Sequence, residues 1–280
     1  MYKIVKKQIL NDTVTLMEID APAVAKKAKP GQFIILRVNE TGERIPLTIA
    51  DFNAEKGTVT IIFQIVGKTT SVLNMLGEGE YILDFVGPLG TPSELDGLKK
   101  VAVIGGGLGT AIAYPQAKAL SKMGTEVHLI AGFRNKDLII LEEEMKAVSN
   151  KTVIVTDDGS NGNKGFVTTA LDTLIGEGNE YDMVVAIGPL MMMRAVCNMT
   201  KERGIKTIVS MNPVMIDGTG MCGCCRLTVG GETKFACIDG PDFDGHQVDF
   251  EEAIRRSRMF KTEEQQSRDE HCNLMKKEVK

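Results

Sequence analysis

Four of the six cysteines in this 280-residue chain lie within sixteen residues of one another: Cys222, Cys224, Cys225 and Cys237. So close a group in a cysteine-poor chain is typical of metal or redox chemistry rather than of a secreted disulfide scaffold. Plant-type [2Fe–2S] loops use the spacing C-x4-C-x2-C followed by a distant fourth cysteine. Cys222-x2-Cys225 and Cys237 fill three of those positions, which predicts an iron–sulfur cluster.

The fourth position, five residues before Cys222, holds Asp217. A carboxylate is a hard oxygen donor that can replace a thiolate on iron. We therefore interpret Asp217, Cys222, Cys225 and Cys237 as the ligands, with Cys224 as a bystander or a reserve ligand. The glycines between them suit a loop that wraps closely around a cluster.

A structural zinc site is the nearest alternative, because Zn²⁺ takes four thiolates. Zinc knuckles usually contain two C-x-x-C pairs, and this segment contains one. The adjacent thiols of Cys224 and Cys225 cannot easily face one ion. Unliganded thiols are the third possibility, and the spacing favours iron and sulfur over both.

A second chemical feature is the run Gly-Gly-Gly-Leu-Gly-Thr at residues 105–110, between an apolar strand pattern and a helix pattern. Such a loop presents backbone N–H groups to a phosphate at a helix N-terminus. We expect nucleotide contacts from Gly105, Gly107, Gly109 and Thr110. The dinucleotide fingerprint requires glycine at position 110, which disfavours an ordinary Rossmann dehydrogenase. A merely tight strand-to-helix turn is the alternative.

The next two strand ends bear on the choice of nucleotide. Arg134 follows one strand and could meet a 2′-phosphate, whereas Asp157 and Asp158 follow the next, would repel that phosphate and could hold ribose hydroxyls. The pattern leaves NAD and NADP open, with a preference for NAD.

Periodicity divides the chain into four parts. Residues 1–97 alternate with period two between glycine and proline turns, which predicts a small antiparallel barrel with one short helix at Ser71–Leu76. Residues 98–212 alternate five apolar strands with helices, one of them at Leu138–Val148, which predicts a parallel sheet. Residues 213–240 hold the cysteines. Residues 241–280 become a charged helical tail, the expected partner interface.

Composition excludes several classes. Apolar residues make up 43% and charged residues 25% of the chain, which is a globular balance. The net charge of −4 argues against nucleic acid as a partner. No apolar run approaches the ~18 residues of a membrane span, and the N-terminus lacks the apolar stretch of a secretory signal. We expect a cytoplasmic protein with no membrane partner.

The barrel carries Arg44-Ile45-Pro46-Leu47-Thr48, an arginine fork near a hydroxyl, as a phosphate clamp requires. Alone, it is no more specific than a surface arginine beside a turn. Together with Val66–Thr70 (VGKTT), Gly87–Gly90 (GPLG) and the Gly105–Thr110 loop, it resembles the ferredoxin–NADP reductase superfamily. The resemblance implies FAD on the barrel and NAD(H) on the α/β domain. It implies these flavin contacts: Arg44, Pro46, Leu47, Thr48, Val66, Gly67, Thr69 and Thr70.

The order of barrel, nucleotide domain and cysteine segment extends the resemblance over essentially the whole chain, to FAD/[2Fe–2S] electron-transfer subunits. These include the subunits of dihydroorotate dehydrogenase and the small subunits of NADH-dependent ferredoxin:NADP oxidoreductase, also called sulfide dehydrogenase. Asp217 and the tail around Asp249–Phe260 favour the second group, because dihydroorotate-type subunits carry four cysteines.

The resemblance implies an NAD(P)H-dependent oxidoreductase subunit that passes electrons between NAD(H), FAD and the cluster. It also implies a heterodimer with a larger iron–sulfur flavoprotein subunit, an indirect link to ferredoxin, and electron bifurcation by the whole complex. Two alternatives are a nucleotide-sensing subunit without turnover and a stand-alone reductase.

Overall fold

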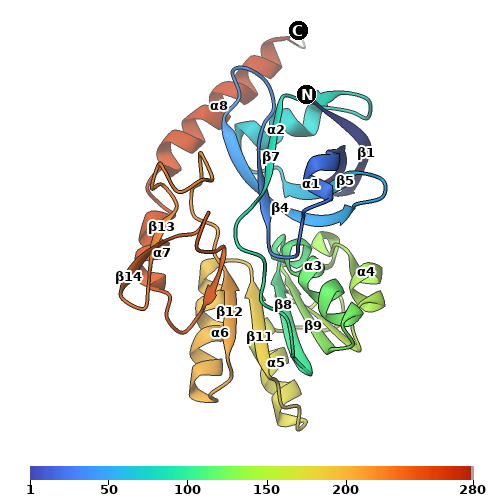
Figure 1. Cartoon of the computed structure of the whole chain (residues 1–280), viewed down its shortest axis with the longest axis vertical. Coiled ribbons are helices and arrows are strands. Elements are labelled where there is room, and N and C mark those ends of the chain that lie inside the picture. Colours follow the sequence, from blue (N-terminus) through green and yellow to red (C-terminus); the bar gives the residue numbers. More distant parts are fainter. Residues whose placement is uncertain (279–280) are drawn as a thin grey trace.

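A computed structural model describes residues 1–278, with side chains described for residues 1–270. Figure 1 shows a barrel at one end, a helix-covered sheet at the other, and the C-terminal segment along one side of both. No helix within the described part is long and apolar enough to cross a bilayer.

The first part is a seven-stranded antiparallel sheet in the order β6-β1-β2-β5-β4-β3-β7. The two end strands are separated in sequence by Leu83 alone, so the sheet curls until its edges nearly meet. Large side chains such as Phe63 and Phe85 fill the interior. The elements are β1 (Tyr2–Asn11), β2 (Val14–Asp20), α1 (Pro22–Ala25), β3 (Phe33–Arg37), β4 (Arg44–Asn53), β5 (Thr58–Gln64), α2 (Lys68–Met75), β6 (Tyr81–Ile82) and β7 (Asp84–Leu89).

The second part is a six-stranded sheet in the order β10-β9-β8-β11-β12-β15, in which β15 (Asp242–Asp244) comes from the C-terminal segment. Its first five strands are parallel, as the sequence predicts, and α3 and α4 cover one face while α5 and α6 cover the other. The elements are β8 (Lys100–Gly106), α3 (Gly109–Lys122), β9 (Glu126–Phe133), α4 (Glu142–Ala147), β10 (Lys151–Thr156), α5 (Val167–Gly176), β11 (Met183–Ile187), α6 (Leu190–Glu202) and β12 (Thr207–Ser210).

Two helix boundaries differ from the sequence prediction. The helix expected over Leu138–Val148 begins only at Glu142, because Leu141 adopts a left-handed backbone with φ +56°. The helix expected at Ser71–Leu76 begins earlier, at Lys68, with Gly67 as its N-cap residue. This earlier start places the predicted flavin segment at a helix N-terminus.

The C-terminal segment leaves the parallel sheet and returns to it. A hairpin of β13 (Arg226–Val229) and β14 (Glu232–Phe235) follows the cysteine loop, and β15 (Asp242–Asp244) then pairs antiparallel with β12. Helix α7 (Phe250–Arg256) packs against α6, and α8 (Lys261–Glu278) runs alongside α2 of the barrel (Figure 1). The last helix therefore packs against the barrel, which is built from the N-terminal part of the chain.

A buried carboxyl lies where the three parts meet. Asp242 on β15 accepts hydrogen bonds from the Ser93 hydroxyl at 2.5 Å and the Gln116 amide at 3.1 Å. Its second oxygen, Oδ1, is shielded from solvent and has no hydrogen-bond partner among the described residues. Burial raises the pKa of Asp242, and the hydrogen bonds from Ser93, Ser210 and Gln116 offset only part of that rise.

The raised pKa of Asp242 predicts a pH-dependent stability. The folded chain holds the Asp242 proton more tightly than the unfolded chain. The protonated carboxyl therefore makes its full contribution to the free energy of unfolding below the ordinary aspartate pKa, and this contribution is lost as pH rises through the raised pKa of the folded state. Asp242→Asn stays neutral and should reduce the fall in Tm as pH rises from 4 to 9. Exposed Asp96→Asn is the control, and identical pH profiles for wild type and Asp242→Asn would contradict the assignment.

Candidate functional site

The first predicted flavin segment is the part of β4 that pairs with a neighbouring strand on one side only. Residues Arg44–Thr48 pair with β3, with Pro46 opposite Ile35, whereas the pairing with β5 begins only at Ile49. Proline lacks a backbone N–H and fits a stretch that is unpaired on one side. Arg44, Pro46, Leu47 and Thr48 are all half-buried. This stretch of β4 thus leaves one backbone edge free for a bound group.

The second predicted segment forms the start of α2. The Thr70 hydroxyl accepts hydrogen bonds from the N–H groups of Val66 and Gly67, at 3.0 Å each. The first N–H groups of a helix have no intrahelical partner and favour an anion. The Thr69 side chain is buried and donates to Glu43 Oε2 at 3.1 Å. Thr69 can therefore offer a bound phosphate its N–H but not its hydroxyl.

The glycines of the 105–110 loop have different roles. A Cβ at Gly105 would lie 2.5 Å from the Thr110 Cα, and one at Gly109 would lie 2.3 Å from the Ile187 carbonyl oxygen, so both are required for packing. Gly107 has φ +55° and open space beside it, and its N–H donates to the Gly132 carbonyl at 2.8 Å. Among these glycines, Gly107 is the one with room for a phosphate.

The loop also contains an unpaired buried hydroxyl and lies near the predicted selectivity residues. Thr110 Oγ1 is buried without a hydrogen-bond partner among the described residues, which fits a loop that receives a polar ligand. Asp158 N–H donates to the Arg134 carbonyl at 3.3 Å, so Arg134 and the Asp157–Asp158 pair lie at one sheet edge. All three side chains are exposed. Hydrogen bonds from Ser160 lower the pKa of Asp158, which keeps it ionised.

The four predicted cluster ligands lie in two pairs. The Sγ atoms of Cys225 and Cys237 are 3.3 Å apart and buried. Asp217 lies beside Cys222, whose N–H donates to Asp217 Oδ2 at 3.0 Å, and hydrogen bonds from Cys222 and Thr219 hold the Asp217 pKa well below its usual range. Two donor pairs fit a cluster with two irons, each of which takes two protein ligands.

Asp217 also holds the loop backbone, a second role that the spacing does not predict. Its Oδ1 accepts the Thr219 N–H at 2.8 Å. Cys224 is half-buried and contacts Cys222. No three His, Cys, Asp or Glu side chains among the described residues converge on a single-ion site.

A hydrogen bond joins the predicted flavin segment of β4 to the cysteine loop. Arg44 Nε donates to the Ile216 carbonyl oxygen at 2.9 Å, one residue before Asp217. A second arginine, Arg256 of α7, donates to the Cys224 carbonyl at 3.2 Å. The sequence reasoning missed Arg256; the N-cap Asp249 followed by Glu252 could have placed the helix that carries it.

Two families of known proteins match the parts of the chain that hold the cysteine loop and the glycine loop. The family described as the iron-sulfur cluster binding domain of dihydroorotate dehydrogenase B matches residues 212–249, and the oxidoreductase NAD-binding domain family matches residues 103–198. A Thermotoga maritima homolog of the dihydroorotate dehydrogenase B (NAD(+)) electron transfer subunit is 46% identical, over 94% of this chain and 92% of its own length. The Fusobacterium nucleatum electron transfer subunit is 33% identical, over 87% and 95%.

This chain belongs to the dihydroorotate dehydrogenase B electron-transfer-subunit family. A solved structure of the NADH-dependent reduced ferredoxin-NADP oxidoreductase, from a study of flavin-based electron bifurcation, superposes with a TM-score of 0.91 at 44% identity, covering 96% of this chain and 97% of the other. The resemblance inferred from the sequence is confirmed. The chain is an electron-transfer subunit of an oxidoreductase family that combines a ferredoxin–NADP reductase-like flavin-binding barrel, an NAD-binding domain and an iron–sulfur-binding domain.

The ligand assignment predicts the outcome of three substitutions. Cys224→Ser should retain two irons per chain, because Cys224 lies outside the two donor pairs. Asp217→Asn keeps an oxygen that can accept the Thr219 N–H but binds iron weakly, so iron should be lost while the loop backbone stays held. Asp217→Cys should keep the cluster with a shifted midpoint potential. Iron content and the EPR signal of the reduced proteins measure all three.

The opposite pattern would reassign the site. Iron loss in Cys224→Ser with full iron and an unchanged signal in Asp217→Asn would make Cys224 the fourth ligand.

Proposed function

We propose that this chain is the FAD- and [2Fe–2S]-carrying electron-transfer subunit of an NADH-dependent ferredoxin:NADP oxidoreductase, working with a larger iron–sulfur flavoprotein subunit in electron bifurcation. The Arg44–Ile216 hydrogen bond carries the proposal, because it ties the flavin segment to the residue beside the first cluster ligand. Arg44 can hold a diphosphate with the remaining donors of its fork. The same side chain then sets the spacing between the two redox sites.

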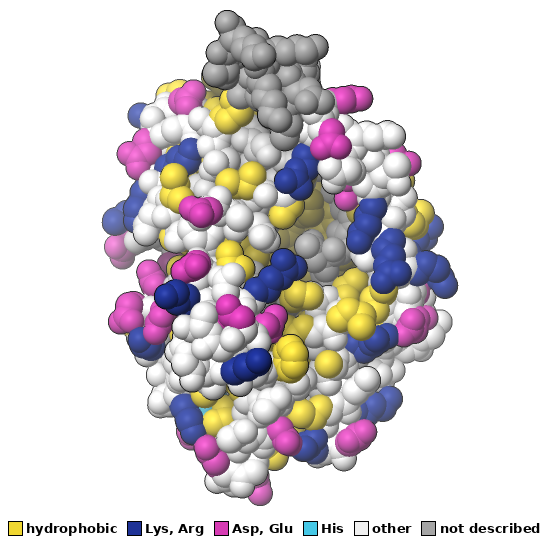
Figure 2. All heavy atoms as spheres, turned by 180° about the vertical axis from the view of Figure 1, so that it is seen from behind, with side chains coloured by type: hydrophobic (Ala, Val, Ile, Leu, Met, Phe, Trp, Pro, Cys, Tyr) yellow, Lys and Arg dark blue, Asp and Glu magenta, His cyan; other side chains and the backbone are white. Residues whose placement is uncertain are grey.

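The protein's role is to bind and orient. When bound, FAD exchanges a hydride with the nicotinamide and single electrons with the cluster. The α2 N-terminus and Arg44 hold the flavin phosphates, Gly107 admits the nucleotide phosphates, and the two donor pairs hold the irons. Figure 2 shows a hollow at mid-height on one face, with hydrophobic side chains gathered in it and Lys and Arg side chains around it, which is suited to a bound dinucleotide.

Exposed apolar side chains around the cluster loop support docking onto the larger subunit. Met221, next to the exposed ligand Cys222, is 89% exposed, and Ile216 and Ile238 are about half exposed, at 46% and 48%. Large apolar side chains grouped on a surface mark an interaction site. A partner on this face would lie beside Cys222.

NAD is the proposed nucleotide. The ionised Asp158 at the sheet edge would repel a 2′-phosphate and can accept hydrogen bonds from ribose hydroxyls. A dihydroorotate-oxidising complex is the second candidate, which the names of the curated relatives favour. Asp217 in place of a fourth cysteine favours the ferredoxin-linked complex. Anaerobic NADH should bleach the flavin absorption of the purified chain, and a chain whose bound flavin stays oxidised would instead be a nucleotide sensor.

Arg44→Ala should lower FAD occupancy by about tenfold, because one charge-assisted clamp is lost. Arg44→Lys keeps the charge but loses the planar fork of donors, so its FAD occupancy should lie between those of Arg44→Ala and the wild type. The measurement is the ratio of flavin to protein after dialysis. Full flavin retention in Arg44→Ala would remove this residue from the site.

Gly107→Ala should raise the KM for NADH by about tenfold without loss of FAD, since the methyl group fills the space beside the loop N–H groups. Gly124→Ala is the matched control: Gly124 also has positive φ and open surroundings but lies at the far end of α3. If the KM for NADH rises equally in the two variants, backbone strain alone explains the effect of Gly107→Ala.

A further inference from the structure

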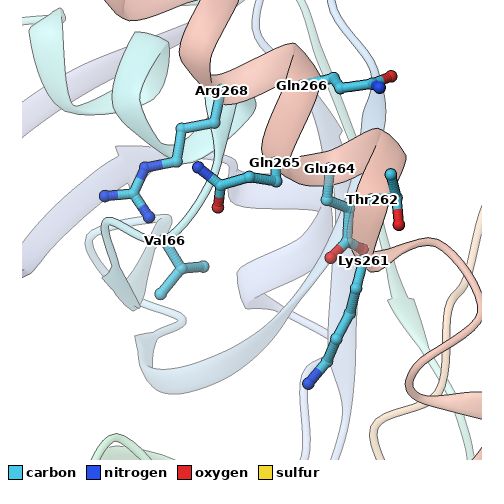
Figure 3. A pocket seen from close by; sticks show the side chains of 7 residues that line it. All are labelled: Val66, Lys261, Thr262, Glu264, Gln265, Gln266 and Arg268. Atoms are coloured by element: carbon cyan, nitrogen blue, oxygen red, sulfur yellow. The ribbon is translucent and has the colours of Figure 1, made fainter.

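A cavity of about 570 Å³ that is open to solvent and lined by exposed side chains lies between α8 and the loop that leads into α2. Val66 lines it from the barrel, and Lys261, Glu264, Gln265 and Arg268 line it from the first turns of α8 (Figure 3). Val66 immediately precedes Gly67, the N-cap residue of α2. The volume is within the range of small-molecule sites and suits half of a dinucleotide.

The α8 wall of this cavity is polar. Residues 261–270 read KTEEQQSRDE and contain no apolar side chain. These first turns of α8 are therefore not held in place by burial of an apolar face. The space between α8 and the loop that leads into α2 is therefore lined mainly by polar side chains, which suit a polar or charged ligand.

The charges around the cavity favour an anion. Figure 3 shows the Arg268 guanidinium and the Gln265 amide directed toward Val66, with Lys261 on the preceding turn. Arg268 makes no ion pair with a described side chain. Glu264 is the single acid among the lining residues. The positive end of α2 thus lies on one side of the cavity and an arginine fork lies on the other.

We propose that α8 is the second wall of the flavin site, where Arg268 binds a phosphate of the adenylate half of FAD. This inference rests on the proposed flavin function of the barrel. Arg44 then serves the site from β4 and Arg268 serves it from the chain's last helix. FMN has no adenylate half, so the α8 wall gives the subunit its preference for FAD over FMN.

The test compares FAD and FMN affinities of the full-length apoprotein by flavin fluorescence titration. Arg268→Ala should raise the Kd for FAD about tenfold and leave the Kd for FMN within about twofold. Arg268→Lys should recover part of the loss. Glu264→Gln removes the opposing charge and should tighten FAD binding, a change of sign that general damage to α8 would not produce. Arg258→Ala, an exposed arginine outside the cavity, should change neither Kd.

The outcomes separate this inference from the proposed function. A wild-type chain that binds neither flavin overturns the flavin function itself. Normal FAD binding by Arg268→Ala, alongside weakened binding by Arg44→Ala, overturns only the role of α8. Equal losses of FAD and FMN affinity in Arg268→Ala would also overturn it, because the contact would then lie outside the adenylate half.

Discussion

A single apolar cluster spans all three parts of the molecule, and the arrangement of the chemical segments depends on it. The buried thiols of Cys225 and Cys237 lie in the same cluster as Phe33 and Ile35 of the barrel. Strands β8 and β11 contribute Ile104, Val184 and Ala186 to it. Packed interiors transmit strain and do not deform continuously. The cysteine loop therefore cannot shift against the barrel without disturbing the core of the NAD-binding domain.

Polar contacts then orient the parts that this core holds together. Arg44 reaches the cluster loop from β4, and Lys118 of α3 pairs with Asp51 of the same strand at 2.6 Å. The β4 strand thus contacts both neighbouring parts. Asp242 adds a third connection, between the linker residue Ser93 and Gln116 of α3.

Regular periodicity made the fold class predictable, whereas contacts between distant residues were not. The βαβ alternation and the period-two barrel both appear in the structure, because burial of one face imposes a repeating pattern on the sequence. β15 has three residues, too few for a pattern, and its place beside β12 depends on pairing alone. The first turns of α8 give no pattern from which their packing could be predicted, since residues 261–270 contain no apolar side chain.

The candidate site divides in the same way. Glycine spacing located the 105–110 loop, but the separation of Gly107 from its packing neighbours Gly105 and Gly109 needed the backbone in three dimensions. Cysteine spacing identified the cluster segment, but it gave no sign that Asp217 also holds the Thr219 N–H. A sequence motif thus identifies the residue types that a site needs, whereas the role of each residue depends on its neighbours in the folded chain.

The return of the chain to β12 makes the cysteine segment an insertion between two paired strands. Ser210 and Asp242 face each other in the sheet, so the ends of a loop of about thirty residues are held together. Loop-closure entropy grows by about 0.6 kcal/mol per doubling of length, so this loop costs about 2 kcal/mol more to close than a four-residue turn. So small a difference means that closure entropy does not limit the length of this loop. The limit comes from the core instead, because Leu227 and Ala236 are buried in the cluster shared with the barrel, and a short turn between β12 and β15 would leave their space empty.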